Sequence, residues 1–557
     1  MNWRLAQLRP SRFSRAKWVL SALTILGHNV PTADAALLKP TRLGGAQAQG
    51  PATRSVTAIH HNPAVLAILP GFQVNATMAT GLDHQVVRRF PTDHSGRPQP
   101  GLLTRQHLLN PTGNYFVGGS FLLDSVAIGA AYYSLNERFR IQSNRSLQYQ
   151  LKTDPHLGCE WKTNTPCPNW PRHGGSVQLQ TDFALSLALH TLEKFNFGVS
   201  FHFPRLHSSL GRNEDRRLLS HDMKSEGCNP ESNEAVEDPR CVKHFSFRTR
   251  TRRRWLGLNP NPSSRLDFAI SLGLAIELSD DLIFGFRYQT PPLLEGGTIT
   301  LHGQARVCLP GEEHDKNDPR HCDRSRPIGA TLQQQLPQEA SLGISYKWGP
   351  KQRWKLDTNF YWIDRCPGKK QGCKDRSNQQ LTFTGQHFDP AHPPQMVLYR
   401  GYQDVYGVEL WLAYHLWKTE AKIAKLRPLR SRTSLLVGTS ANTPGVSLNA
   451  ITVTENAGWT LSSTIGFDFE LLRGSTLLSI IPGYGFDLIL PVRIGPGGRP
   501  PAYRPEDALK FEQSNGDINP DAADTVLQGR GRPTNAGSYF GAVHTLSLSV
   551  RWGERPR

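Results

Sequence analysis

Eight cysteines are the residues of this 557-residue chain whose types and spacing most clearly indicate chemistry. Zinc sites usually take pairs of thiolates separated by ~2–4 residues, and the spacing here is wider. The simplest interpretation is four local disulfides, each closing one polar loop, and such bonds persist in the periplasm and on the cell surface. The four sequence pairs are Cys159 and Cys167, Cys228 and Cys241, Cys308 and Cys322, and Cys366 and Cys373.

A basic cluster is the second group of side chains suited to binding. Arginine binds phosphate and carboxylate groups through two parallel hydrogen bonds. The cluster therefore indicates contact with the phosphates of lipopolysaccharide or capture of a ligand carboxylate, and a simply solvated basic loop is the third interpretation. Its members are Arg248, Arg250, Arg252, Arg253 and Arg254.

Metal and catalytic motifs are weaker. Residues 517–524 have the spacing of an oxygen-rich calcium loop but lack its closing glutamate, and His314, Asp315 and His321 lie near Cys322. We expect polar loops, not metal sites, in both places. The chain has no phosphate-binding glycine loop, dinucleotide fingerprint, Gly-x-Ser-x-Gly elbow or His-Glu-x-x-His motif. We therefore expect no enzyme activity and no cofactor, with a barrel lipase as a testable alternative.

Strands must position these groups, because apolar and polar residues alternate along much of the chain. From residue 266 to 276 every even position is Leu, Phe or Ile, and every odd position is small or charged. A strand places alternate side chains on opposite faces. Several such segments reach the ~9–11 residues that a tilted membrane-spanning strand needs. Mid-strand charges at Asp267, Lys355, Glu409 and Asp468 are tolerable only on a face that lines a polar lumen.

We count about fourteen strands of this kind, and an even number places both chain ends on the periplasmic side of a bacterial barrel. Tryptophans at strand ends predict an aromatic girdle, and Pro482 with Gly483 predicts a kink or bulge. The predicted strands are 70–81, 113–124, 126–135, 176–190, 194–204, 265–278, 282–290, 338–348, 352–363, 402–417, 428–440, 458–471, 475–487 and 538–552. The girdle residues are Trp348, Trp354, Trp417, Trp459 and Trp552.

The connections between these strands alternate between short turns and long polar stretches. Short periplasmic turns and long outer loops are typical of outer-membrane barrels, whereas a soluble β-sandwich needs no such alternation. All eight cysteines fall in the long stretches, which links the two patterns. The long stretches are 82–112, 136–175, 205–264, 291–337, 364–401, 441–457 and 488–537.

The N-terminal residues and the charge also indicate export. Residues 1–35 combine a basic start, an apolar run from Trp18 and the small residues of Ala33-Asp34-Ala35, as in a cleaved signal peptide. The formal net charge of the chain is +18, which favours anionic lipid or an anionic ligand as a partner. Export makes nucleic acid the least expected partner.

Residues 36–69 lack strand alternation and hold two distinctive stretches, Leu43-Gly44-Gly45-Ala46 and Asn62-Pro63-Ala64. Together with residues 337–346, the strand from Tyr402 to Tyr414 and the closing strand, they resemble the FadL/TodX family of outer-membrane transport proteins. The resemblance implies a 14-stranded barrel with an N-terminal hatch folded inside it, and Asn62, Pro63 and Ala64 as hatch residues. It further implies passive uptake of long-chain fatty acids or aromatic hydrocarbons, with exit sideways through a wall opening.

We therefore predict an all-β fold, a transmembrane antiparallel β-barrel of about 14 strands whose lumen is plugged by an N-terminal hatch. The expected domains are a signal peptide (1–35), a hatch (36–69) and a barrel with long disulfide-tied outer loops (70–557). We expect a monomer in a Gram-negative outer membrane that takes up hydrophobic small molecules and contacts membrane lipid and lipopolysaccharide. The alternative is a general porin or a structural surface barrel without specificity for hydrophobic molecules.

Overall fold

The computed structural model describes residues 45–89, 104–138, 177–217, 242–252, 268–293, 297–308, 328–365, 379–384, 395–398, 403–421, 429–445, 458–494 and 537–554. Most of them lie in β-strands. Within these ranges no helix has the length and apolar character needed to span a bilayer.

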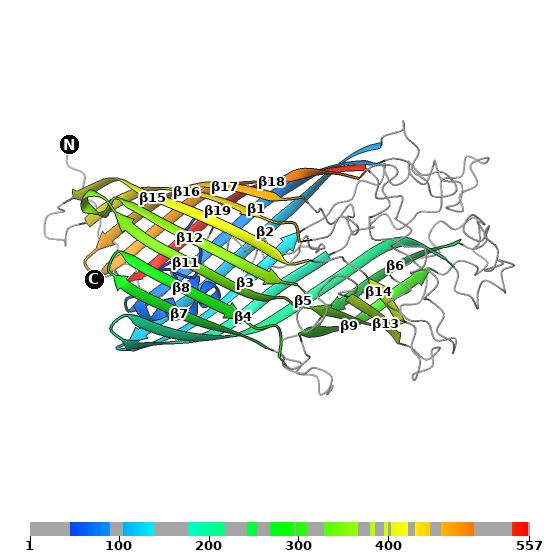
Figure 1. Ribbon diagram of the computed structural model, residues 1–557, viewed down its shortest axis with the longest axis horizontal. Coiled ribbons are helices and arrows are strands. Elements are labelled where there is room, and N and C mark those ends of the chain that lie inside the picture. The colour runs from blue at the N-terminus through cyan, green and yellow to red at the C-terminus, as the bar shows by residue number, and fades with distance from the viewer. Residues whose placement is uncertain are drawn as a thin grey trace, which may run out of the picture.

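Fourteen of the strands close into one antiparallel barrel (Figure 1). The seam between the last strand and the first runs in register from Gln73 opposite Gly553 to Arg89 opposite Gly537. Each of the fourteen predicted strands overlaps one of these, so the predicted antiparallel barrel of fourteen strands is confirmed. The barrel strands are β1 (Phe72–Arg89), β2 (Thr104–Leu123), β3 (Val126–Arg138), β4 (Val177–Leu192), β5 (Phe195–Arg217), β7 (Ala269–Ser279), β8 (Leu282–Gln289), β11 (Gln338–Trp348), β12 (Trp354–Asp364), β15 (Val405–Ala421), β16 (Leu429–Asn442), β17 (Thr460–Arg473), β18 (Thr476–Ile494) and β19 (Gly537–Glu554).

Strand β17 shows how sequence alternation becomes two chemically different faces. Its outward residues Leu461 and Ile465 are 42% and 45% exposed, whereas its inward Asp468 is 7% exposed. Large apolar residues are exposed in the same way on the other barrel strands, and such a continuous apolar band is stable only against hydrocarbon. Glu409 and Asp468 are buried on the inward face, as the sequence predicts. Trp411, which breaks the alternation of β15, is buried against Gly438 of the neighbouring strand β16.

Aromatic residues mark one end of the barrel, which we call the turn end because the short connections lie there. The rings of Tyr346, Trp348, Trp354 and Tyr414 follow one another at centroid distances of 5.7, 6.1 and 4.3 Å. Phe72 of β1 meets Trp552 of β19 at 5.5 Å. The predicted girdle is therefore present at Trp348, Trp354 and Trp552. Trp459 lies at the opposite, loop end and is half exposed.

Five further strands lie beyond the loop end and form what we call the extension sheet: β6 (Val242–Arg252), β9 (Thr298–Cys308), β10 (Ile328–Gln335), β13 (Gln379–Thr384) and β14 (Gln395–Leu398) (Figure 1). They continue the barrel wall, because the outer half of β5 pairs with β6, and the order then runs β9, β10, β13 and β14. The sequence predicts only loops in these stretches, which is wrong. Strands outside the membrane carry no row of lipid-facing residues, so their alternation is weak.

The predicted irregularity at Pro482 takes a different form from a bulge. Pairing between β17 and β18 stops after Gly466 opposite Gly483 and resumes at Phe469 opposite Ile480 in the same register. Proline has no backbone N–H to donate, so the ladder is interrupted without an extra residue.

Candidate functional site: the segment inside the barrel

Residues 45–69, which we call the inner segment, precede β1 and lie inside the barrel near the turn end (Figure 1). The segment contains a single helical turn, α2 (Ala58–His61), and a 3-10 helix, η1 (Pro63–Ile68). Asn62 separates them, and its Oδ1 accepts a hydrogen bond from the Ala64 N–H at 3.1 Å. Pro63 suits the first helical position because its φ is fixed and no N–H is needed there.

The inner segment crosses the bore from wall to wall. At its start, Ala46 packs with Leu436 of β16 and Ile481 of β18. Farther along, Thr53 Oγ1 donates to Asp357 Oδ1 of β12 at 3.3 Å, and Arg54 forms an ion pair with Glu277 of β7 at 2.8 Å.

On the other side of the bore the backbone of the segment is itself bound. Ser200 Oγ of β5 donates to the Ile59 carbonyl at 2.9 Å. Strands on several sides of the barrel therefore hold one 25-residue stretch, and most of its residues are buried.

Asn62 is the polar centre of the segment and is completely buried. Its Nδ2 donates to the Pro51 carbonyl at 2.6 Å and to the Leu274 carbonyl of β7 at 2.9 Å. One amide thus ties two parts of the segment together and binds both to the wall. A buried amide with both donor hydrogens and its acceptor paired fixes a single geometry, because each broken bond would leave a buried group unsatisfied.

Wall glycines make this close approach possible. A Cβ on Gly273 would overlap Asn62 Oδ1, and one on Gly198, its cross-strand partner, would overlap the Pro63–Ala64 backbone. A Cβ on Gly466 would lie 2.6 Å from the Cβ of Ala46. Larger residues at these positions would therefore exclude the segment. The glycines whose added Cβ meets the segment are Gly129, Gly198, Gly273, Gly285, Gly343, Gly466 and Gly483.

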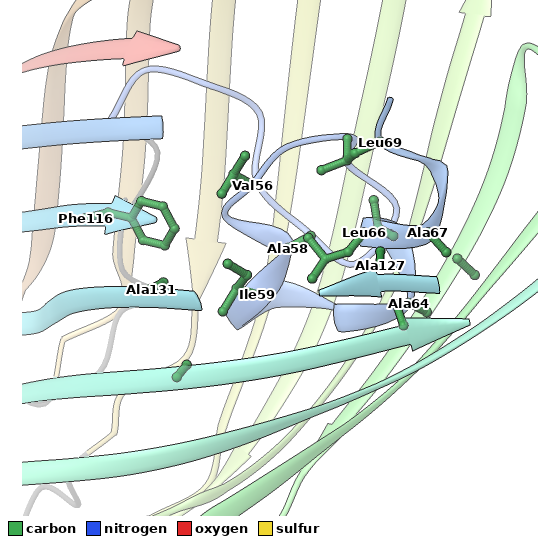
Figure 2. Packing of buried hydrophobic residues seen from close by; sticks show 14 of the residues in the cluster. Val56, Ala58, Ile59, Ala64, Leu66, Ala67, Leu69, Phe116, Ala127 and Ala131 are labelled. Atoms are coloured by element: carbon green, nitrogen blue, oxygen red, sulfur yellow. The ribbon is translucent and has the colours of Figure 1, made fainter. Parts of the chain in front are cut away.

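Toward β2, β3, β4 and β7 the segment presents an apolar surface. Ile59 and Leu66 are completely buried among small wall residues such as Ala127 and Ala131 (Figure 2). Phe116 of β2 closes the same cluster and stacks on the Tyr133 ring at 5.9 Å. Burial of side chains of this kind stabilises a structure by ~1.5–3 kcal/mol each, so this cluster is the main apolar anchor of the segment.

A chain of polar side chains continues from the segment into the wall. His60 Nδ1 lies 3.2 Å from the Tyr133 hydroxyl, which lies 2.9 Å from His202 Nδ1. His202 Nε2 then lies 2.8 Å from Ser271 Oγ, which donates to Gln289 at 3.2 Å. The chain ends in charge, because Arg287 binds Gln289 and forms a 2.8 Å ion pair with Glu339.

Both histidines of the segment are neutral in this position. Burial, and after it the nearby Arg287 guanidinium, lower the pKa of His61 to about 3. Burial, then Arg287, lowers the pKa of His60 well below its ordinary value as well. His61 Nε2 is buried and, among the described residues, has no hydrogen-bond partner. Protonation of either ring would place an uncompensated charge at the centre of the barrel.

The wall itself is interrupted beside this apolar and polar cluster. The register between β2 and β3 shifts between Gly113 and Phe116, and that between β3 and β4 shifts between Ser134 and Asn136. Tyr133 and the next residue, Ser134, are both fully buried, so the alternation of β3 fails there. Within the described part of the chain, Asn114 Oδ1 and Ser134 Oγ are buried without a hydrogen-bond partner. The strand pairing of the wall is therefore irregular next to Phe116 and Tyr133.

Several solved structures resemble this chain along most of its length. No protein-family model matches this sequence, and no curated protein matches it. A crystal structure of a Pseudomonas aeruginosa FadL homologue is 14% identical, and the match covers 94% of this chain and 98% of that one with a TM-score of 0.55. The toluene transporter TodX of P. putida is 13% identical, with 91% and 98% covered and a TM-score of 0.51. This chain has the FadL/TodX fold.

Within this FadL/TodX-type barrel, Asn62, Pro63 and Ala64 lie inside the bore, and their role as hatch residues stays a prediction. Arg248, Arg250 and Arg252 lie on β6, outside the barrel. Arg253 and Arg254 lie outside the described residues. Cys308 ends β9, and the other seven cysteines lie outside the described residues, so the four disulfides stay predictions. The signal peptide, His314, Asp315, His321 and residues 517–524 lie outside them too. No group of His, Cys, Asp or Glu able to hold a metal occurs among the described residues.

Sequence reasoning missed the residues that receive the inner segment. Tyr133, His202 and Arg287 lie on inward positions of predicted strands, and the glycines share the same parity. A polar or aromatic residue, or a glycine, at an inward mid-strand position was the available signal. That signal could not identify which residue contacts which, however, because contacts across the bore depend on the path of residues 45–69.

Proposed function

We propose that this chain is an outer-membrane channel for the passive uptake of hydrophobic small molecules, long-chain fatty acids or aromatic hydrocarbons, in a Gram-negative bacterium. One observation carries the proposal: in a barrel of the FadL/TodX fold, a segment packed against wall glycines crosses the bore. A general porin needs an open aqueous lumen, and a segment held inside the barrel obstructs such a lumen. The segment acts as the hatch, and the channel performs no chemistry on its substrate.

The loop end supports a role in capture of the substrate. Leu206 lies on the inward face of β5, and the register of the extension sheet places Leu301 and Leu332 on the same side. All three side chains are completely buried. Three buried leucines thus lie on the face that continues the barrel interior beyond its loop end, and a hydrophobic molecule gains free energy on leaving water beside them.

The interrupted wall supports a sideways exit. A hydrophobic molecule that leaves between β2 and β3 enters hydrocarbon directly and avoids the aqueous side of the turn end. Phe116 and Tyr133 line the inward side of that break, and both contact the inner segment. Movement of the segment would therefore uncover the break and the path to it at the same time.

Cross-linking the hatch to the wall tests the proposal. Thr53→Cys combined with Asp357→Cys places two thiols where the native side chains approach within 3.3 Å. We expect a short thiol-specific cross-linker to abolish uptake of radiolabelled oleate and toluene by cells that produce the variant, and reductive cleavage to restore it. The matched control is Thr53→Cys alone with the same reagent.

Uptake that persists in the cross-linked double variant would overturn hatch movement. Planar-bilayer recording separates the alternative functions: large steady currents from the parent protein would favour a porin, whereas a plugged channel gives small ones. Phospholipid hydrolysis by the purified protein would identify a barrel enzyme.

A further inference from the structure

The outward face of β5 changes its chemistry along its length. From the turn end it presents Phe197 and Phe201, which are 47% and 39% exposed, and then Phe203 and Arg205. Phe203 forms an aromatic group with Phe183 and Phe268, at centroid distances of 6.2 and 6.4 Å. Aromatic rings followed by an exposed arginine are typical of the boundary between hydrocarbon and headgroups.

The length of β5 agrees with that boundary. Arg205 lies ten residues beyond Phe195, which is about 33 Å along a strand at ~3.3 Å per residue. With a tilt of ~40° this is roughly 25 Å along the membrane normal, the height of the apolar band of an outer-membrane barrel. The strand continues for twelve more residues, to Arg217. The part of β5 that pairs with β6 therefore lies at and beyond the headgroup level.

The register places the arginine cluster on this outward face. His207 and Ser209, which share the parity of Arg205, pair with Arg252 and Arg250. On the other side of β6, Arg252 and Arg250 pair with His302 and Gln304 of β9, whose side chains are exposed.

The third arginine of β6 extends the same row. Arg248 pairs with a further arginine, Arg306 of β9. Four arginine positions thus gather on one face of two adjacent strands, β6 and β9, on the side of the sheet that continues the lipid-facing wall.

We propose that this outward face of β5, β6 and β9, with Arg248, Arg250 and Arg252 at its centre, binds the phosphate groups of lipopolysaccharide in the outer leaflet. Arginine matches phosphate through its two parallel N–H donors, and a glycolipid phosphate lies at the height where these residues stand. Capture of a substrate carboxylate by the same arginines fits less well, because the opposite face of the sheet continues the barrel interior.

The inference uses the outer-membrane location stated under the proposed function, but its test has a separate readout. Purified full-length protein in lipopolysaccharide-free nanodiscs is titrated with bisphosphorylated lipopolysaccharide and with the same lipid after removal of its phosphates. We expect the phosphorylated lipid to bind more tightly, and high salt to reduce the difference because exposed charges are screened. Equal binding of the two lipids by the parent protein would overturn the proposal without any variant.

Two triple variants with the same change of net charge locate the site. Arg248→Gln with Arg250→Gln and Arg252→Gln removes three outward charges, and we expect binding to weaken on the order of a hundredfold, about fivefold per charge. The control, Arg212→Gln with Arg216→Gln and Lys243→Gln, removes three charges at register positions of the opposite face. We expect it to change binding less than threefold.

Equal losses in the two variants would show an effect of net charge alone and would overturn the site. Uptake of labelled oleate by the outward variant should match the parent. A parent that binds phosphorylated lipid selectively but transports no hydrophobic molecule would refute the proposed function and leave this site standing.

Discussion

Gly273→Ala offers a direct test of the seat of the inner segment. The added methyl group would overlap Asn62 Oδ1 and lie 2.9 Å from the Ala64 nitrogen, so residues 62–64 must move. Overpacking of this kind costs ~1–3 kcal/mol, and weakening the hydrogen bonds of Asn62 adds ~1 kcal/mol for each. We expect the seated state to lose roughly 2–5 kcal/mol, a shift of about 30-fold or more between seated and released segment.

The stability of strand β7 itself should increase, because alanine in place of glycine stabilises a strand interior by ~0.5–1 kcal/mol. Barrel assembly, measured by heat-modifiable gel mobility, should therefore persist while single-channel conductance rises. Gly119→Ala is the matched control, since its nearest atoms, at 3.2 and 3.7 Å, belong to β1 and not to the inner segment. An unchanged conductance in a folded Gly273→Ala protein would refute the close seat.

Three further predictions concern charge and membrane depth. His61 has a pKa of about 3 while the inner segment is seated and regains a pKa of about 6.5 when the segment is released. The released state therefore binds more protons below about pH 6.5. The free energy that favours the seated segment falls with pH in that range, by roughly 2 kcal/mol at pH 5. Conductance should rise accordingly, and less so in His61→Gln. Arg287→Ala leaves Glu339 unpaired and should cost ~3–5 kcal/mol in urea-dependent refolding into vesicles, with the double change Arg287→Met and Glu339→Gln much milder. Leu342→Arg, in the middle of the lipid-facing band, should cost ~2–4 kcal/mol in the same assay, against ~1 or less for Leu278→Arg near the turn end.

The barrel was predictable because lipid imposes a strict rule on every wall strand. Leu342 and Ile465 must face hydrocarbon while their neighbours face the lumen, so alternation over about ten residues survives in the sequence. The number of strands and the inward orientation of the Glu409 side chain followed from that rule alone. Strand β6 obeys no such rule, since both of its faces lie outside the hydrocarbon layer, and the sequence therefore did not reveal it.

The site was predictable only in part. The Asn62-Pro63-Ala64 stretch carried a family resemblance, and the structure places it inside the bore. Its partners, Gly198 and Gly273, lie more than 130 residues away in the sequence, and no local pattern connects them. Glycine at an inward position marks missing volume, but the identity of the group that fills it depends on the three-dimensional path of the chain.

The wall glycines that contact the inner segment also have an evolutionary consequence. Residues of the wall and of the segment limit which substitutions the other can accept. A mutation that enlarges a wall residue at Gly483 is tolerable only if Ala46 opposite it is lost or displaced, and a bulkier residue at position 46 needs the glycine to stay. Related sequences should therefore change such positions in pairs. An engineer who wants a wider or leakier channel would do better to shorten the inner segment than to substitute the wall that surrounds it.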